Sequence, residues 1–328
     1  MEAAHTGLTV RPSADMEDGT CVDCHEDIVD TYEDSLHYTV QGMYNSLENF
    51  AHPETLDDED HPLRQAFDED CSKCHATCGS CHVSRPKTYE GGLHSEHEFT
   101  EPPMDETCYG CHGARPAGEF IGEVGFTADV HYEAGFDCMD CHDVSNFHGT
   151  GEEEQWRFEV ETLPECQDCH GEIYSEDSEI EAHRVHEEDQ LACHVCHSSA
   201  AQSCFNCHIS VDDEGNMSSD STSRVIFNIG QNPEPTEEIP YEYITLRHIP
   251  TTADTFVELN GELPNYDEIS NWKYSPTHNI QRVTRQNESC NSCHGQENLF
   301  FSEDDIREED SEASYDLIPD RIPEPIDN

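Results

Sequence analysis

Residues 71–82 read CSKCHATCGSCH, which is two copies of one pattern, Cys-x-x-Cys-His, with two residues between them. The pattern occurs nine times in the 328-residue chain and uses all 18 cysteines. Its copies are Cys21–His25, Cys71–His75, Cys78–His82, Cys108–His112, Cys138–His142, Cys166–His170, Cys193–His197, Cys204–His208 and Cys290–His294. Because no cysteine is left over, this pattern accounts for every thiol in the protein.

The spacing is the attachment signature of c-type haem. Two thiols bond to the porphyrin edge, and the histidine that follows becomes an axial ligand of the iron. Tetrahedral zinc sites and redox-active dithiols also use Cys-x-x-Cys, but neither requires a histidine directly after every second cysteine. The sequence therefore predicts nine covalently bound haem c groups.

The residues predicted to attach haem are Cys21, Cys24, Cys71, Cys74, Cys78, Cys81, Cys108, Cys111, Cys138, Cys141, Cys166, Cys169, Cys193, Cys196, Cys204, Cys207, Cys290 and Cys293. The predicted proximal iron ligands are His25, His75, His82, His112, His142, His170, His197, His208 and His294.

Thirteen further histidines offer a second axial ligand for each iron, and nine of them are needed if every iron is bound by two histidines. Methionine is the rival ligand, but the six methionines show no recurring offset from a motif. The predicted distal ligands are His37, His61, His97, His131, His148, His183, His186, His248 and His278. Ligation by two histidines implies low-potential, six-coordinate irons.

The other four histidines receive different predictions. His5 is expected to reach across to another subunit, and His52 and His94 are expected to be solvated. His194 lies inside a motif, where it either ligates an adjacent haem or points outward.

The composition favours a core made largely of porphyrin. Only 34% of the residues are hydrophobic, which is low for a globular chain of this length. Nine haems must therefore pack closely and supply the missing apolar volume. The predicted fold class is a multihaem cytochrome c, mostly irregular, with short helices and a small β-hairpin region.

Three regions are expected along the chain: a haem-packed region with eight motifs (1–210), a haem-free segment (211–289), and the ninth motif with an acidic tail (290–328). Helices are predicted around 26–48 and 176–190, and each motif is expected to begin a short helix. The β-forming stretches 224–230 and 241–248 predict a hairpin, with an extended surface loop as the alternative. The tail from 301 is expected to be an arm for a neighbouring subunit, the alternative being that it lies on its own body.

The charge is strongly negative, with 73 acidic against 15 basic residues and a net charge of −58. Such a surface repels itself at ordinary salt, whereas at molar salt the Debye length falls to about 3 Å. The excess of acids predicts a halophilic habitat, the alternative being an acidic protein that docks basic partners. Nucleic acid is excluded as a partner because phosphate contact needs a basic face.

No stretch approaches the ~20 apolar residues of a membrane span. Because c-type haem is attached outside the cytoplasm, the protein is expected to be exported to the cell surface or the extracellular space. Its export signal is then either removed or outside this numbering.

Four stretches resemble the large multihaem c-type cytochromes: Cys71–Pro86, Cys138–Gly149, Cys193–His208 and Trp272–His294. The groups they are most similar to are the octahaem hydroxylamine-oxidoreductase-like and tetrathionate-reductase-like cytochromes, and more loosely the extracellular cytochromes that form filaments. The resemblance implies distal ligation by His97, His131, His148 and His278. This chain departs from those groups in two ways. It has nine motifs where the octahaem cytochromes have eight haems, and it has no motif in which lysine replaces the histidine.

Two functions follow. The first is electron transfer without catalysis along nine haems, with redox-partner cytochromes and other copies of the chain, in a filament, as partners. The second is a reductase or oxidase of small nitrogen or sulfur oxyanions, which requires one open iron. The surplus of histidines and the negative field favour electron transfer, so no catalytic residue is predicted.

Overall fold

The computed structural model describes residues 21–69, 72, 76–85, 91–94, 100, 104–113, 115–123, 125–171, 173, 177–203, 209–211, 217–219 and 224–327. The motifs Cys71–His75 and Cys204–His208, together with His5 and His97, lie outside the described residues. The chain divides into two compact units. Unit 1 comprises Met1–Asn49, Pro53–Ala114 and Phe136–Pro164, and unit 2 comprises Phe50–His52, Arg115–Gly135 and Glu165–Asn328.

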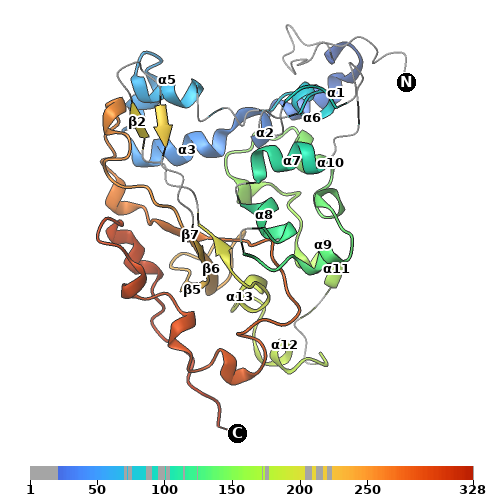
Figure 1. Cartoon of the computed structure of the whole chain (residues 1–328), viewed down its shortest axis with the longest axis vertical. Coiled ribbons are helices and arrows are strands. Elements are labelled where there is room, and N and C mark those ends of the chain that lie inside the picture. Colours follow the sequence, from blue (N-terminus) through green and yellow to red (C-terminus); the bar gives the residue numbers. More distant parts are fainter. Residues whose placement is uncertain are drawn as a thin grey trace. The chain divides into compact units, whose positions relative to one another are not determined.

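Short helices make up the regular structure of unit 1 (Figure 1). They are α1 (Val22–Tyr32), α2 (Leu36–Thr39), α3 (Gln41–Phe50), α4 (Pro53–Asp57), α5 (Pro62–Glu69), α6 (Cys78–His82), α7 (Met104–His112) and α10 (Val144–His148), with 3-10 turns η4 (Cys138–Asp140) and η5 (Arg157–Glu159).

Helix α10 packs on α1, and Gly149 makes this approach possible. Its φ is +71°, and a Cβ there would lie 2.5 Å from the Thr31 carbonyl oxygen. Asp143 caps the start of α10 by accepting a hydrogen bond from the Ser145 backbone N–H at 2.8 Å. The cap and the glycine together fix where His148, the last residue of α10, lies relative to α1.

Unit 2 combines short helices with small antiparallel sheets. Its helices are α8 (Pro116–Ile121), α9 (Val130–Glu133), α11 (Cys166–His170), α12 (Glu181–Val185) and α13 (Cys193–His197). Its 3-10 turns are η6 (Val257–Leu259), η7 (Tyr266–Glu268), η8 (Cys290–Ser292), η9 (Glu297–Leu299), η10 (Glu303–Asp305) and η11 (Glu312–Leu317). Its strands are β1 (Ala201–Gln202), β2 (Ile209–Val211), β3 (Met217–Ser219), β4 (Val225–Ile226), β5 (Asn228–Gln231), β6 (Tyr243–His248) and β7 (Trp272–Tyr274).

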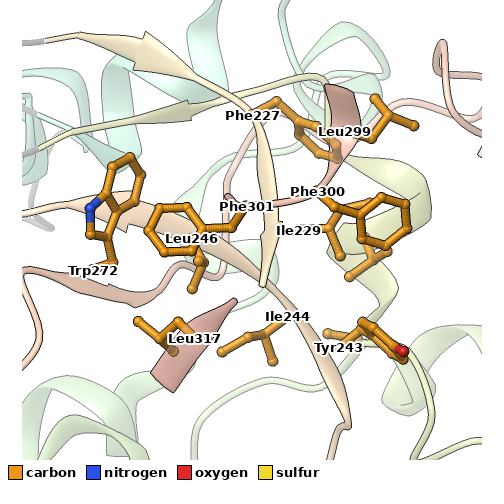
Figure 2. Packing of buried hydrophobic residues seen from close by; sticks show 12 residues of the cluster. Phe227, Ile229, Tyr243, Ile244, Leu246, Trp272, Leu299, Phe300, Phe301 and Leu317 are labelled. Atoms are coloured by element: carbon orange, nitrogen blue, oxygen red, sulfur yellow. The ribbon is translucent and has the colours of Figure 1, made fainter. Parts of the chain in front are cut away.

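The main sheet has the order β5-β6-β7, and β6 in its centre pairs antiparallel with both neighbours. Leu246 lies opposite Asn228 on one side and Tyr274 on the other. Its side chain is fully buried in a hydrophobic cluster on this sheet, together with Trp272 and Phe301, whose ring centroids lie 4.6 Å apart (Figure 2). The strand β1 pairs with β4, and β2 pairs with β3.

The predicted fold class is confirmed in its coarse form. The described chain is mostly irregular, with short helices and small antiparallel sheets. The predicted strand pair is present as β5 and β6, whereas the third strand, β7, was not predicted. The three-part division by haem content stays a prediction.

The predicted helix over 26–48 is broken into α1, α2 and α3. Ser35 takes an extended conformation just before α2, and Val40 takes the left-handed conformation with φ +50° just after it. The motifs also differ from one another. Cys21–His25 begins α1, and Cys108–His112 ends α7. The motifs starting at Cys78, Cys166 and Cys193 form the whole of α6, α11 and α13.

Residues 301–327 lie on the body of their own unit, which was the alternative expectation for the tail. Phe301 and Leu317 belong to the hydrophobic cluster of unit 2, with Ile318 and Ile322 packed against it. The Tyr243 hydroxyl donates to the Arg321 carbonyl oxygen at 3.1 Å. Apolar residues spaced through an acidic segment thus bind it to its own body.

Candidate haem sites

Each described motif closes about one helical turn, which gathers its three functional side chains. The backbone N–H of the motif histidine donates to the carbonyl of the first cysteine, at 3.0 Å for His25, 2.8 Å for His142 and 3.0 Å for His294. Residues i, i+3 and i+4 then share one side of the turn. Two thiols and an imidazole on one side of a turn are the arrangement that a covalently attached porphyrin requires.

The most informative feature is a set of histidine pairs. Each pair joins one motif histidine to one histidine from outside the motifs, and each lies within a single unit. The ring centroids lie 6.2 Å apart in His37–His112, 6.2 Å in His82–His148, 6.1 Å in His131–His170, 6.1 Å in His183–His197 and 6.3 Å in His186–His294.

This separation fits an iron between the two rings. A metal–imidazole bond is about 2 Å long, and two such bonds in line, with the roughly 1 Å radius of each ring, put the ring centroids about 6 Å apart. Five pairs at nearly one distance, all matching a motif histidine with a predicted distal histidine, fit two-histidine axial ligation.

The ring nitrogens of these histidines are also oriented for metal binding. The Nδ1 atom of His131 contacts Asp129 Oδ1 at 2.8 Å. In other pairs Nδ1 lies by a backbone carbonyl oxygen: His82 and Thr100 at 3.0 Å, His186 and Ala182 at 2.9 Å, His197 and Gln281 at 3.1 Å, and His294 and Glu324 at 3.0 Å. A proton on Nδ1 that is donated to these acceptors leaves the Nε2 lone pair for a metal, the usual outer-shell arrangement of ligating histidines.

Burial keeps several of these imidazoles neutral, which is the form that binds metals. It lowers the pKa of His37 to about 4, and the neighbouring His112 ring adds to the effect. Burial also lowers the pKa of His148 and of His183, each with a contribution from its ring partner.

Exposed apolar side chains surround the same sites. Phe136, Met139 and Val144 flank or lie within the motif Cys138–His142, and Ile180 and Val185 flank His183. Their exposed fractions run from 43% for Phe136 to 65% for Val185. Covering one such side chain stabilises a protein by ~1.5–3 kcal/mol, and a porphyrin face would provide that cover. The donors, their orientation and the apolar surroundings all fit haem c.

Neighbouring motifs lie against one another through their first cysteines. Thiols are hydrogen-bonded between Cys21 and Cys78, and between Cys108 and Cys138, in unit 1. In unit 2 the same contact joins Cys166 and Cys193. Attachment points are thus grouped in pairs along each unit.

The remaining motif histidines in the described residues are His25 and His142. His142 Nδ1 lies 3.1 Å from Asn146 Oδ1, and its ring lies beside Phe147. His25 is exposed and has non-helical backbone angles within α1.

Three predicted distal ligands have other surroundings in the structure. His61 Nδ1 accepts a hydrogen bond from the Leu63 backbone N–H at 3.1 Å, at the start of α5. His248 is buried against Trp272, with Nε2 2.8 Å from Asp310 Oδ1. The backbone N–H of His278 donates to Glu119 Oε2 at 2.9 Å. Their assignment as ligands stays a prediction, as does that of His97.

The prediction that His52 is solvated is confirmed, because its side chain is exposed. The same prediction for His94 is wrong. The His94 side chain is only 2% exposed, with Nδ1 3.3 Å from Glu106 Oε2. His194 is half-buried, its ring 6.3 Å from that of Tyr274.

Sequence reasoning missed the residues that orient the rings, such as Asp129 and Asn146. Asp129 lies two residues before His131, and Asn146 lies four after His142. These short spacings were available in the sequence as signals. The carbonyl acceptors, by contrast, leave no residue-type signal. Those of His82, His197 and His294 come from other segments, and that of His186 belongs to Ala182, four residues earlier.

Among the described residues, no three or more His, Cys, Asp or Glu side chains gather as they would at a single metal centre. No helix in the same part of the chain is long and apolar enough to cross a membrane. Comparison with known protein families, curated proteins and solved structures finds no match to this chain.

Proposed function

We propose that this protein transfers electrons along c-type haems whose irons are each held by two histidines. The observation that carries the proposal is the set of five histidine pairs with ring centroids 6.1–6.3 Å apart. When bound, each haem supplies an iron that alternates between the ferric and ferrous states. The chain's own residues attach the porphyrins, fill both axial positions and exclude competing ligands.

The closeness of the attachment points supports transfer within each unit. In unit 1, thiol contacts join Cys21 to Cys78 and Cys108 to Cys138. Burial, and then the neighbouring Cys108, raises the pKa of the Cys81 thiol to about 11. These contacts support the order of motifs 21, 78, 108 and 138 in one series.

Unit 2 has a comparable series. Cys166 contacts Cys193, which supports adjacency of their motifs. His183, in α12, pairs with His197, and His186, three residues later, pairs with His294. Distal ligands one helical turn apart support adjacency of motifs 193 and 290.

Filled axial positions favour conduction over catalysis, because a reductase needs an open iron. The net charge of −58 supports a protein working at high salt, outside the cell, where screening reduces repulsion from partner cytochromes and from other copies of the chain. Assembly into a filament belongs to the same proposal, and electron microscopy at molar salt that shows only discrete particles would exclude it.

Mass spectrometry and electron paramagnetic resonance of the native protein test the central claim. We expect nine covalent haems and nine low-spin ferric signals that added nitrite or sulfite leaves unchanged. A high-spin haem whose spectrum responds to these anions would contradict pure electron transfer and favour an oxyanion reductase.

A variant tests the pairing itself. His183→Met should convert one haem to mixed His/Met ligation and raise its reduction potential, since thioether ligation favours the ferrous state. His52→Met is the matched control, because His52 is exposed, and it should leave every potential unchanged. Equal titration curves for both variants would contradict ligation by His183.

A further inference from the structure

Residues 323–326, which we call the strap, lie against the ninth Cys-x-x-Cys-His motif in unit 2. The Asn291 side chain holds the strap by two hydrogen bonds. Its Oδ1 accepts from the Ile326 backbone N–H at 2.8 Å, and its Nδ2 donates to the Ile326 carbonyl oxygen at 3.0 Å. The backbone N–H of Gly295 donates to the Pro323 carbonyl oxygen at 2.7 Å. The strap is therefore fixed to the motif through both of its end residues.

Between these two attachments the strap meets the motif histidine. The Glu324 carbonyl oxygen lies 3.0 Å from His294 Nδ1, and because a carbonyl oxygen only accepts hydrogen bonds, the proton of the ring lies on Nδ1. The Nε2 lone pair is then free, on a ring whose centroid lies 6.3 Å from that of His186. The strap thus favours the tautomer of His294 that can bind an iron.

Gly295, which directly follows the motif, allows the strap to come this close. Its φ is +76°, and a Cβ there would lie 2.6 Å from Cγ and 3.2 Å from Cδ of Pro325. Any other residue at position 295 would push against the Pro325 ring. The contact between the motif and the strap therefore depends on the absence of a side chain at this one position.

The two prolines restrict the strap before it binds. Proline fixes its own φ and limits the residue before it to extended conformations, so Glu324 is restricted by Pro325. Such a segment loses less conformational entropy when it becomes ordered. The chain just before the strap is also held, because Ile322 packs against the hydrophobic cluster and the Arg321 carbonyl oxygen accepts from the Tyr243 hydroxyl at 3.1 Å. The core of unit 2 thus directs the strap toward the motif.

We propose that the strap positions His294 and lowers the reduction potential of the haem attached at Cys290 and Cys293. This inference rests on the proposed function. A ligand histidine whose Nδ1 proton is donated to an acceptor is a more basic ligand of its metal. Stronger donation to the iron favours the ferric state, so loss of the strap should make this haem easier to reduce. The acceptor is a backbone carbonyl, and the Glu324 side chain itself is exposed.

The first test is a spectroelectrochemical titration of the nine-haem protein carrying Asn291→Leu. This change removes both hydrogen bonds to Ile326 at nearly constant side-chain size. One midpoint should shift to a more positive potential, and one low-spin signal in electron paramagnetic resonance should change its g-values. Asn298→Leu is the matched control, because Asn298 is an exposed asparagine four residues beyond His294, and it should shift no midpoint. An unchanged midpoint in Asn291→Leu would overturn the proposal.

A second pair of variants separates the strap from distortion of the motif. Gly295→Ala should raise the same midpoint, because the new Cβ would strike the Pro325 ring. Pro325→Ala removes the two ring carbons nearest to that Cβ, so the double variant should recover most of the wild-type midpoint. A double variant that keeps the full shift would assign the effect to backbone strain at position 295 and overturn the role of the strap.

Two further measurements separate hydrogen bonding from charge. Glu324→Gln keeps the backbone carbonyl and removes the exposed carboxylate. A shift as large as that of Asn291→Leu would assign the effect to charge and overturn the proposal. Amide hydrogen exchange at Ile326 should be faster in Asn291→Leu than in the wild type or in Asn298→Leu, since its backbone N–H loses its acceptor. Faster exchange with unchanged midpoints would show a released strap that does not act on the haem.

His186→Met distinguishes failure of this inference from failure of the proposed function. It should raise the midpoint of the same haem, because His186 is the ring partner of His294. If His186→Met shifts one midpoint and Asn291→Leu shifts none, the strap alone is overturned. If His186→Met shifts none, the histidine pairing on which the proposed function depends is overturned as well.

Discussion

At the scale of single residues, the sites depend on small polar contacts behind the histidines. The Asp129 side chain makes three such contacts. It caps α9 by accepting from the His131 backbone N–H at 2.8 Å, contacts His131 Nδ1 at 2.8 Å, and accepts from the Ile280 N–H at 2.6 Å. One buried carboxylate thus fixes a helix start, a ring orientation and a distant loop.

Asp129→Asn should weaken the iron bond of His131, because an amide supports the imidazole less strongly than a carboxylate does. Losses of about 10- to 100-fold in metal affinity are typical when such a partner is changed. We expect one haem to bind added imidazole more readily and its reduction potential to rise, as measured by optical titration. The control is Asp143→Asn, which alters an exposed helix cap next to the motif histidine His142. Identical imidazole titrations for the two variants would contradict this role of Asp129.

At the scale of elements, the main sheet gives unit 2 a conventional hydrophobic core beside its Cys-x-x-Cys-His motifs. Leu246→Ala should lower the free energy of unfolding by about 2–5 kcal/mol, because it leaves a cavity among packed rings and aliphatic chains. Val257→Ala is the matched control, since Val257 is 61% exposed, and it should change stability by less than about 0.5 kcal/mol. Chemical denaturation of the haem-loaded protein measures both. A small effect of Leu246→Ala would show that porphyrin packing, and not this cluster, dominates the stability of unit 2.

The sequence indicated some elements and not others, for physical reasons. The stretches around Ile229 and Ile244 carry β-forming residues, so the pairing of β5 with β6 could be predicted. The three-residue strand β7 could not, because Trp272–Tyr274 becomes a strand only by pairing with β6. The break between α2 and α3 at Val40 could not be predicted either, since valine rarely takes a positive φ.

The same contrast holds for the haem sites. The nine motifs could be read directly, because the proposed covalent attachment of haem requires fixed residue types at a fixed spacing. Which distal histidine meets which motif depends on the folded path of the chain, as with His37 and His112, which are 75 residues apart. The buried position of His94 and the tail on its own body depend on tertiary packing in the same way.

At the scale of the whole molecule, the net charge of −58 is the dominant property. We expect the melting temperature to rise between 0.1 and 2 M sodium chloride, because the Debye length falls from about 10 Å to about 3 Å or less and mutual repulsion of carboxylates is screened. Calorimetry at several salt concentrations measures this. Sucrose is the control, since it favours compact states without screening charge. A melting temperature that does not change or falls with salt would contradict a halophilic adaptation.

The two histidines carried by α12 and its end have a further consequence. His183 and His186 belong to two different pairs, yet His183 lies in α12 and His186 directly follows the last residue of that helix. A slide of that helix by one residue, about 1.5 Å, would displace both imidazoles together. The same short segment therefore carries both imidazoles, so the distance between the two histidine pairs should change little. If both pairs hold haem irons as proposed, segment 181–186 is a spacer between them, and we expect a backbone movement of this segment to affect both sites together.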